Sequence, residues 1–437
     1  MILGIEVRAD RVTAVLVAGG QVLHSATLAI DLLEERLDEL CPRALRAGVR
    51  AVVLATDLVD ELLAGEELLS PVGVVRLAEV EARWAPPFQG WPPELARRLG
   101  APGRHLAPDP SETELDALAA DFTARGFATL AVTAERSPWT PVAERDLGRR
   151  LLARLPDAAL TLSHALGSLG LLPRENATII NAALIAPVGA WLDLRRAEIA
   201  AAGIDAPLYL CRYDGTLVGE EYARAHPIVT RGGRRAALAR GAAVLAGVQD
   251  GWVVLGGDAP TAIGLLGGYA RRSEAGADVH GIPTSLPGLE QHALPSPRYQ
   301  GPDDDPRLLT AAQALTPSIA LPVIALIGPP RVLTRGEGTR RRPLPALPLA
   351  EITALGAASA QVGGESGRIV DDDAPLGIAA VVEEARLLAL ASGAALDSLQ
   401  VLETTSNAVA YAGPRAVRVT ARVIGLPGLE RNPACAP

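Results

Sequence analysis

The sequence predicts an α/β protein whose central sheet is largely parallel. Short runs of β-branched and aliphatic residues alternate with segments in which leucines recur at helical spacing. This cycle starts again near Ala159, and each half includes a strand, a turn and a strand. The pattern indicates a duplicated architecture, with an N-terminal lobe over residues 1–158 and a C-terminal lobe over residues 159–437.

The first lobe is expected to begin with a meander of three strands. Short breaks at Arg8 to Asp10 and at Gly19-Gly20 separate three β-rich runs. Leucines near helical spacing predict a helix after the meander. In order, the expected elements are strands at residues 2–7, 12–17 and 22–30, a helix at residues 32–47, and a short buried strand at residues 51–55.

The rest of the first lobe continues the alternation. Residues 73–77 read as a strand, and residues 112–125 as a helix that Ser111 caps. A strand follows at residues 129–133. Residues 141–155 are again helical, with a proline in the first turn, where its missing N–H costs nothing.

The second lobe is expected to repeat this pattern around a long irregular segment. Residues 272–306 are rich in Gly, Pro, Ser and Asp and have little periodicity, which predicts a loop region. Residues 343–348 read as a connector. The other expected elements are a helix at residues 177–202, a strand at 208–211, a helix at 234–246, a strand at 252–255, a helix at 376–392, and strands at 398–404 and 416–424.

Composition excludes several classes of function. The chain has 437 residues and a net charge of −9, and its aromatic content is 3%, which argues against a nucleic-acid partner. It contains no lysine, so a Walker A lysine, a Schiff-base lysine and a biotin attachment site are all excluded. Its three cysteines form no CxxC pair, and its histidines have no metal-ligand spacing, so we expect neither a disulfide framework nor a metal site.

The N-terminus and the hydropathy pattern predict a soluble cytoplasmic protein. The opening residues carry acidic groups by Glu6 and have no long apolar stretch, unlike a signal peptide. No uncharged apolar run of about 18 residues is present to span a membrane. Asp157, Ser163 and His164 lie close together, but no G-x-S-x-G elbow supports a hydrolase triad there.

One block of the sequence carries a family resemblance. The runs from Asn176 to Ile185, from Trp191 to Leu194, from Ala201 to Tyr209 and from Arg212 to Val218, followed by Glu220-Glu221, resemble the central segment of hydantoinase A and 5-oxoprolinase subunits. Weaker likeness, near residues 55–63, 131–145, 364–367 and 407–411, extends over most of the chain. The resemblance implies the two-lobed, ribonuclease H-like fold of actin, Hsp70 and sugar kinases, with a cleft between the lobes.

That family implies a chemistry as well. Its members use ATP to open cyclic amides or to carboxylate ketones, usually with a second, different subunit. Two hairpin loops of the pattern Asp-x-Gly-Gly-Thr grip the phosphates, because glycines let backbone N–H groups approach phosphate oxygens and the aspartate holds the metal.

Both loops depart from that pattern. The first runs from Glu6 to Asp10 and keeps a carboxylate, but it has lost both glycines and the threonine, so an ordinary hairpin turn is the alternative interpretation. The second keeps Gly256-Gly257, has Val254 in place of the aspartate and Asp258 in place of the threonine. Pro260 removes one backbone donor there.

A third segment is altered too. The family has Ser-Gly-Pro-Ala-Ala-Gly after the central block, where this chain has Gly233-Arg234-Arg235-Ala-Ala-Leu. With Arg231, these arginines could bind an anion at a helix start, although a solvated basic helix end is the simpler interpretation. Asp214-Gly215 is the best-preserved polar pair, and in the family this segment borders the cleft.

Two hypotheses follow. The loop changes favour a non-catalytic or regulatory member, or a small-molecule binder in the cleft, with a second hydantoinase-type subunit or another copy of itself as partner. The alternative is a diverged ATP-dependent subunit with Glu6 and Asp258 as catalytic carboxylates and Mg²⁺ as its metal. In that case Gly256, Gly257, Asp214, Gly215 and Arg234 are the expected nucleotide-binding residues.

Overall fold

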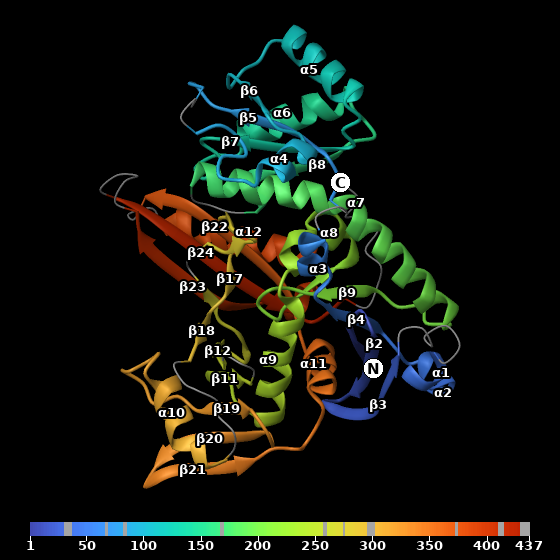
Figure 1. The fold of residues 1–437 in the computed structure, drawn as a ribbon, viewed down its shortest axis with the longest axis vertical. Helices are drawn as coiled ribbons and strands as arrows, with labels where there is room; N and C mark the ends of the chain where they lie inside the picture. Colours follow the sequence, from blue (N-terminus) through green and yellow to red (C-terminus); the bar gives the residue numbers. More distant parts are fainter. Residues whose placement is uncertain are drawn as a thin grey trace.

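Three larger sheets with helices between and around them form the computed structural model of this chain (Figure 1). The structure describes residues 1–29, 37–65, 69–81, 85–166, 170–256, 260–273, 276–294, 302–371, 375–409 and 415–428. The α/β class predicted from the sequence is confirmed. The largely parallel central sheet is wrong, since five of the eight strand pairings in the largest sheet are antiparallel.

The largest sheet has nine strands and joins the two ends of the chain. Its first strands form the predicted meander, and the central three strands, β1, β4 and β9, run parallel. Along the sheet the order is β23 (Gln400–Ala408), β24 (Ala416–Gly425), β22 (Val362–Asp371), β10 (Leu217–Gly219), β9 (Leu208–Cys211), β4 (Ala51–Thr56), β1 (Ile2–Val7), β2 (Arg11–Ala18) and β3 (Gln21–Ala29). Strands from both sides of residue 158 therefore share one sheet, and the boundary there stays a prediction.

The single helix predicted at residues 32–47 is wrong in its described part. Two short helices occupy the segment, α1 (Leu37–Leu40) and α2 (Arg43–Arg46). Pro42 lies between them with an extended backbone, because proline has no N–H to continue the helical ladder. Residues 32–36 of the predicted helix lie outside the described part.

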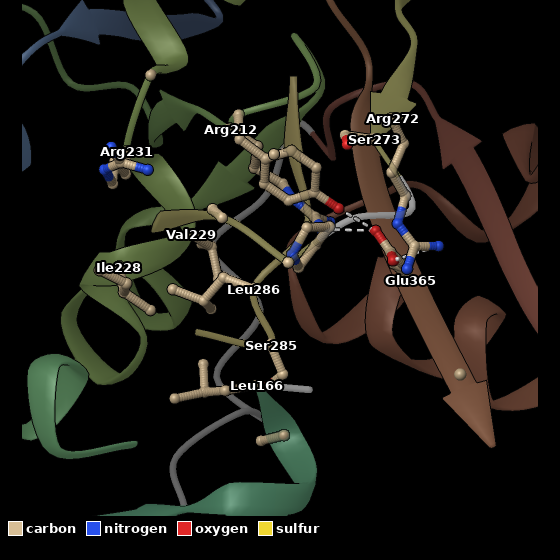
Figure 2. Close-up of a pocket in the computed structure, with 18 of the residues that line it drawn as sticks. Leu166, Arg212, Ile228, Val229, Arg231, Arg272, Ser273, Ser285, Leu286 and Glu365 are labelled. Carbon is tan, nitrogen blue, oxygen red and sulfur yellow. Dashed lines mark hydrogen bonds and ion pairs between the residues drawn. The ribbon is translucent and has the colours of Figure 1, made fainter. Parts of the chain in front are cut away.

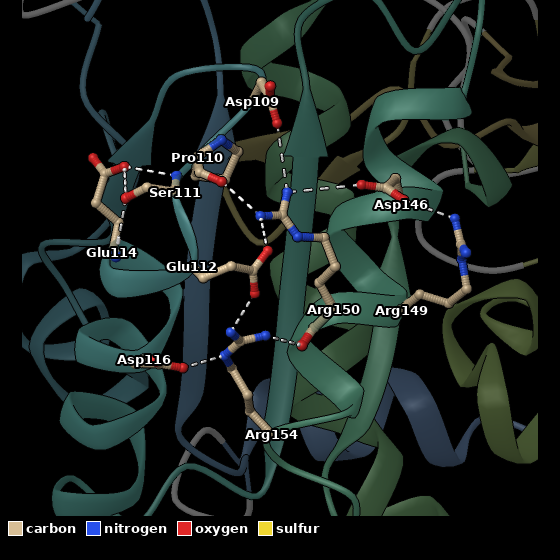
Figure 3. Close-up of polar contacts among 10 residues, drawn as sticks. All are labelled: Asp109, Pro110, Ser111, Glu112, Glu114, Asp116, Asp146, Arg149, Arg150 and Arg154. Atoms are coloured by element: carbon tan, nitrogen blue, oxygen red, sulfur yellow. Dashed lines mark hydrogen bonds and ion pairs between the residues drawn. The ribbon is translucent and has the colours of Figure 1, made fainter.

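A four-stranded parallel sheet follows, with the order β6 (Arg104–Leu106), β5 (Val72–Leu77), β7 (Thr129–Ala134) and β8 (Ala159–Leu162). Helix α4 (Pro93–Leu99), α5 (Glu112–Ala124) and α6 (Val142–Leu152) connect its strands. The predicted cap of α5 is confirmed, since Ser111 and Glu114 form a reciprocal capping box. Figure 3 shows how Arg150 of α6 and Arg154, just after that helix, join α5 through Glu112, so the two helices pair on the surface.

Helix α7 (Leu171–Ala201) runs beneath this sheet toward the large one (Figure 1). It starts six residues before the predicted position. Pro187 interrupts its ladder, and the carbonyl of Ala183 that is freed in this way accepts the N–H of Ser70 at 3.0 Å. Among the described helices α7 alone has the length and hydropathy of a membrane span, but 56% of its most apolar window is buried inside the protein.

The third sheet is formed by the segment between α9 (Gly233–Ala246) and α11 (Leu349–Ala358). Its strands, in sheet order, are β13 (Tyr269–Ala270), β12 (Thr261–Leu266), β11 (Gly251–Leu255), β19 (Val323–Leu326), β20 (Arg331–Gly336) and β21 (Gly338–Pro343), with β18 (Gln291–Ala293) beside β12. Helix α10 (Asp305–Gln313) packs on it. The predicted loop region holds only two-residue pairings, β14 (Arg272–Ser273) with β17 (Gly288–Leu289) and β15 (Asp278–Val279) with β16 (Ile282–Pro283), before β18.

Helices α9 and α11 lie side by side between the nine-stranded sheet and the third sheet (Figure 1). Glycines bring their backbones together: a Cβ on Gly241 would lie 1.9 Å from the carbonyl oxygen of Ile352, and one on Gly356 would lie 1.8 Å from that of Ala237. The sequence predicted α9 but not α11. At the C-terminal end, α12 (Pro375–Ala391) confirms the last predicted helix and packs on β22 and β24.

Candidate functional site

A cavity of about 910 Å³ opens where parallel strands from two sheets end. Strands β4 and β9 of the large sheet and β7 and β8 of the four-stranded sheet all run into loops that line it. The loops contribute Asp57 and Asp60 after β4, Arg212 and Tyr213 after β9, Ser137 and Arg145 after β7, and His164 and Leu166 after β8. Ligands of α/β proteins bind at such carboxyl ends, which makes this cavity the candidate functional site.

The first predicted loop does not itself line the cavity, but Arg234 joins Glu6 of that loop to Asp57, which does. Glu6 is the sixth residue of the chain and lies in β1 with 1% of its surface exposed. Nη1 of Arg234, in the first turn of α9, lies 3.3 Å from Oε1 of Glu6, and Nε of the same arginine donates to Asp57. Burial raises the pKa of Glu6, and the nearby Arg234 partly offsets that rise.

The β1–β2 turn itself is an ordinary hairpin turn. The N–H of Arg8 donates to the carbonyl of Arg11 at 3.0 Å, and Asp10 pairs with Arg11 at 2.6 Å in solvent. Asp10 therefore points to its neighbour on β2. The segment is thus a hairpin turn, and its loss of phosphate binding stays a prediction.

The described residues here do not fit a divalent cation. The guanidinium of Arg234 contacts both Glu6 and Asp57, so a positive charge already lies against the two carboxylates that could hold a metal. No cluster of three or more acidic, histidine or cysteine side chains suited to a metal occurs in the described ranges. One feature favours a bound ligand at this position. Oε2 of Glu6 is buried and accepts no hydrogen bond from the described residues.

The other arginines predicted at the start of α9 are also paired within the chain. Nε of Arg231 lies 3.0 Å from Asp60, whose second oxygen accepts the N–H of Gly232 at 3.1 Å. Arg235 donates to Gln291 at 2.8 Å. Arg231 and Arg235 line the cavity, and one nitrogen of each lies against an acid or an amide of the chain.

Asp214 and Gly215 form a buried turn after β9 and are not among the residues that line the cavity. Oδ1 of Asp214 accepts from both the N–H and the hydroxyl of Thr216, and Oδ2 accepts from Arg422 of β24 at 2.8 Å. Burial alone would raise the pKa of Asp214, but Arg422 and Arg212 lower it to about 2. Gly215 has a φ of +82°, which explains the glycine. A nucleotide-binding role for this pair stays a prediction.

The second predicted loop lies largely outside the described residues. Gly256 directly follows β11 in the third sheet and is exposed beside Ile327. Gly257 and Asp258 are outside the described part, so the structure places neither. The roles predicted for these three residues are untested.

The centre of the cavity is a network around Glu365 of β22 (Figure 2). Arg272 reaches one oxygen of Glu365 at 3.1 Å, and Tyr213 donates its hydroxyl to the other, with Arg212 at 3.6 Å from it. Burial would raise the pKa of Glu365, but Arg272 and Arg212 hold it below its ordinary value. This network ties the segment after β13 to the large sheet, and sequence reasoning missed it because its members are far apart in the chain.

The far end of the cavity holds a second group that the sequence did not reveal. The carboxylate of Glu144, fully buried in α6, accepts from Nδ1 of His164 at 2.5 Å and from the hydroxyl of Ser163 at 2.5 Å. Nε2 of His164 lies 3.2 Å from Nε of Arg145. The acid beside Ser163 and His164 is thus Glu144, about 20 residues away in sequence. Within the described part of the chain, no hydrogen bond or ion pair joins Asp157 to either residue.

Comparison with known proteins supports the fold. The structure of an ATP-dependent caprolactamase from Pseudomonas jessenii matches with a TM-score of 0.67 and 12% identity, over 99% of this chain and 88% of that one. A nucleotide-free acetone carboxylase matches with a TM-score of 0.60 and 11% identity, over 100% of this chain and 88% of that one. No protein-family model and no curated protein matches the sequence. The chain therefore shares its mixed α/β fold with these two enzymes.

Proposed function

We propose that this chain is a diverged member of the hydantoinase A and 5-oxoprolinase family that binds a small molecule in the 910 Å³ cavity without using ATP. The observation that carries the proposal is the position of Arg234, whose guanidinium contacts both Glu6 and Asp57. A metal-nucleotide complex needs those carboxylates free, because a bound cation and the guanidinium repel each other. The structures of two ATP-dependent enzymes match nearly the whole chain at 11–12% sequence identity. This agrees with a common origin followed by the loss of nucleotide binding.

The two-lobed, actin-like organisation belongs to the same proposal. We infer that the α9–α11 pair is the hinge region between a lobe with the nine-stranded sheet and a lobe with the third sheet. Close backbone contact at Gly241 and Gly356 supports this placement. A soluble cytoplasmic location, and a second hydantoinase-type subunit or another copy of the chain as partner, are part of the proposal as well.

One observation favours the alternative, an ATP-dependent amidohydrolase or a subunit of ketone-carboxylase type. Oε2 of Glu6 is buried without a hydrogen-bond partner, and such a group costs about 1–3 kcal/mol unless something binds it. If Arg234 turned away, Glu6 and Asp57 would face one another as a pair of acids. ATP with Mg²⁺ would then be the cofactor, and Asp258 would be the acid of the second loop.

Calorimetry separates the two candidates. The protein is titrated with ATP and with ADP in the presence of Mg²⁺, alongside Glu6→Ala and the control Glu94→Ala, whose side chain is 81% exposed on α4. We expect no nucleotide binding by any of the three proteins. Micromolar binding that Glu6→Ala abolishes and Glu94→Ala retains would establish the ATP-dependent candidate instead.

Small-molecule binding in the cavity is tested by a thermal-shift screen with small organic acids and amides. At least one compound is expected to raise the unfolding temperature, and Ala165→Trp is expected to remove that shift. Ala165 is exposed and lines the cavity, so an indole ring there fills the space without disturbing the core. A screen in which no compound acts, or in which Ala165→Trp responds like the unmodified protein, would exclude the cavity as the binding site.

A further inference from the structure

The end of the cavity at β7 and β8 has the features of an anion subsite. Three side chains line it from neighbouring segments: Ser137 three residues after β7, Arg145 in the first turns of α6, and His164 two residues after β8. The hydrogen bond from the N–H of Ile369 to the carbonyl of Pro138 holds the loop after β7 against β22. The subsite therefore lies between two sheets, on elements that tertiary contacts fix.

Glu144 fixes the imidazole of His164. Its carboxylate accepts the N–H groups of Ala134, Ser163 and His164 at 3.0–3.1 Å, in addition to the side chains of Ser163 and His164. Burial alone would raise the pKa of Glu144, yet the hydrogen bonds from His164 and Ser163 hold that pKa below its ordinary value. An ionised acceptor at Nδ1 puts the proton on that nitrogen and leaves Nε2 as an acceptor.

His164 in turn orients Arg145. Nε2 of His164 accepts from Nε of Arg145 at 3.2 Å. The two Nη groups of Arg145 have no hydrogen-bond partner among the residues that the structure describes, and the side chain lines the cavity. A chain of carboxylate, imidazole and guanidinium thus presents a fork of N–H donors, which is the geometry that binds a carboxylate bidentately.

Ser137 supplies an independent sign of a ligand. Its side chain is 5% exposed, lines the cavity, and its hydroxyl has no hydrogen-bond partner within the described part of the chain. A buried hydroxyl that donates to nothing is destabilising, which points to a ligand that accepts from it. An oxygen of a bound anion would accept this hydrogen bond.

The opposite wall limits the charge of the ligand. Glu384 of α12 lines the cavity and is paired with Arg368 and Ser366, and Arg145 acts on it through its charge. A dianion such as a phosphate monoester would be repelled by Glu384 more strongly than a carboxylate would. The charge balance therefore favours a single negative charge.

We propose that Arg145 and Ser137 bind the carboxylate of a small organic acid in this cavity, with His164 and Glu144 as positioning residues for the guanidinium. This assignment rests on the proposed small-molecule binding and names the class of ligand. Each group of the cluster then has one role. Arg145 and Ser137 donate to the ligand, and His164 and Glu144 orient the guanidinium of Arg145.

Two isosteric probes test the assignment, benzoate and the neutral benzamide, each titrated by ligand-observed NMR. The unmodified protein is expected to prefer benzoate by about tenfold or more, as for a charge-assisted bidentate contact. Arg145→Gln is expected to lose that preference. Arg149→Gln is the matched control, since Arg149 lies on the same helix, is 78% exposed and pairs with Asp146 outside the cavity.

His164→Gln distinguishes positioning from general loss of structure. A merely structural defect would weaken benzoate and benzamide together, whereas a misdirected guanidinium lowers the affinity for benzoate alone. Phenyl phosphate is expected to bind no more tightly than benzoate. Tighter binding of phenyl phosphate, or equal affinity for benzoate in Arg145→Gln and Arg149→Gln, would overturn the assignment.

The outcomes keep this inference apart from the proposed function. If both probes bind equally and Ala165→Trp blocks both, the cavity binds small molecules and the carboxylate subsite is wrong. If neither probe binds while other compounds in the thermal-shift screen do, the carboxylate assignment is also wrong. The proposal that the cavity binds a small molecule is then retained. If nothing binds in either experiment, both proposals fall.

Discussion

The contact between α9 and α11 gives a stability prediction that can be worked from atomic positions. Gly356→Ala places a methyl group 1.8 Å from the carbonyl oxygen of Ala237 and 2.6 Å from the backbone nitrogen of Gly241. Ordinary contact distances are about 3.5 Å, so the two helices would have to separate by about 1.5 Å. Both atoms belong to backbone, and neither can rotate away. The strain matters for the site because α9 also carries Arg234.

The cost follows from two opposing effects. Overpacking of this kind costs about 3 kcal/mol, whereas alanine in place of glycine favours a helix by about 1 kcal/mol, so the net loss is about 2 kcal/mol. With about 2.1 cal/mol/K of unfolding entropy per residue, 437 residues give about 0.9 kcal/mol/K, and the loss lowers the unfolding midpoint by about 2 °C. A unit that unfolds separately would show a larger fall.

Scanning calorimetry compares this variant with Gly189→Ala. Gly189 lies in α7, and a Cβ there would meet only Nη1 of Arg224 at 3.8 Å. The control keeps the helix-propensity gain without the clash, and its midpoint is expected to rise by about 1 °C. If the midpoint of Gly356→Ala equals or exceeds that of Gly189→Ala, the close helix contact is not rigid and the reasoning is refuted.

Two buried ionisable groups predict how stability depends on pH. The folded-state pKa of Asp214 is about 2 against an ordinary value of 3.8, so its stabilising effect of roughly 2 kcal/mol is present above pH 4 and is lost as the pH falls toward 2. In urea unfolding, Asp214→Asn should therefore have a lower free energy of unfolding than the unmodified protein at pH 7. The difference between the two proteins should shrink below pH 4. A difference that does not change with pH would contradict this. Burial lowers the pKa of His226 to about 4 from 6.5, so the protein should lose roughly 3 kcal/mol as the pH falls from 6.5 to 4. His226→Phe keeps the ring stacked on Tyr222 and should escape that loss, and parallel decline of both proteins would argue against the assignment.

The sequence predicted those elements whose signal is local. The meander, the capped helix α5 and helix α12 have alternating or helical patterns and turn residues that the structure confirms. Helix α11 was missed because nearly every side chain from Ile352 to Ala358 is buried, against β1, β2, β4 and α9. A helix buried on all sides has no polar face, so it shows no amphipathic period.

The site was less predictable than the fold because its contacts join distant parts of the chain. Arg234 and Glu6 are 228 residues apart, and Arg422 and Asp214 are 208 apart. The resemblance to a family pointed to Glu6, Arg234 and Asp214, but only the structure shows that other residues of the chain neutralise them. Glu144 left no sequence signal, since a glutamate in the first turn of a helix is ordinary.

The absence of lysine bears on how the carboxylates near the cavity are paired. Every cation of the chain apart from histidine and the N-terminus is an arginine, and its planar fork can contact two acids at once, as a compact ammonium group does less well. Arg234 does so with Glu6 and Asp57, and Arg422 does so with Asp214 and Glu403. In each case one guanidinium contacts a buried carboxylate and a partly exposed one, so Glu6 and Asp57, the acids that could have held a metal, already share a cation of the chain. Arg145 is arranged differently from Arg234 and Arg422: its Nε donates to the imidazole of His164, not to a carboxylate, and its side chain lines the cavity.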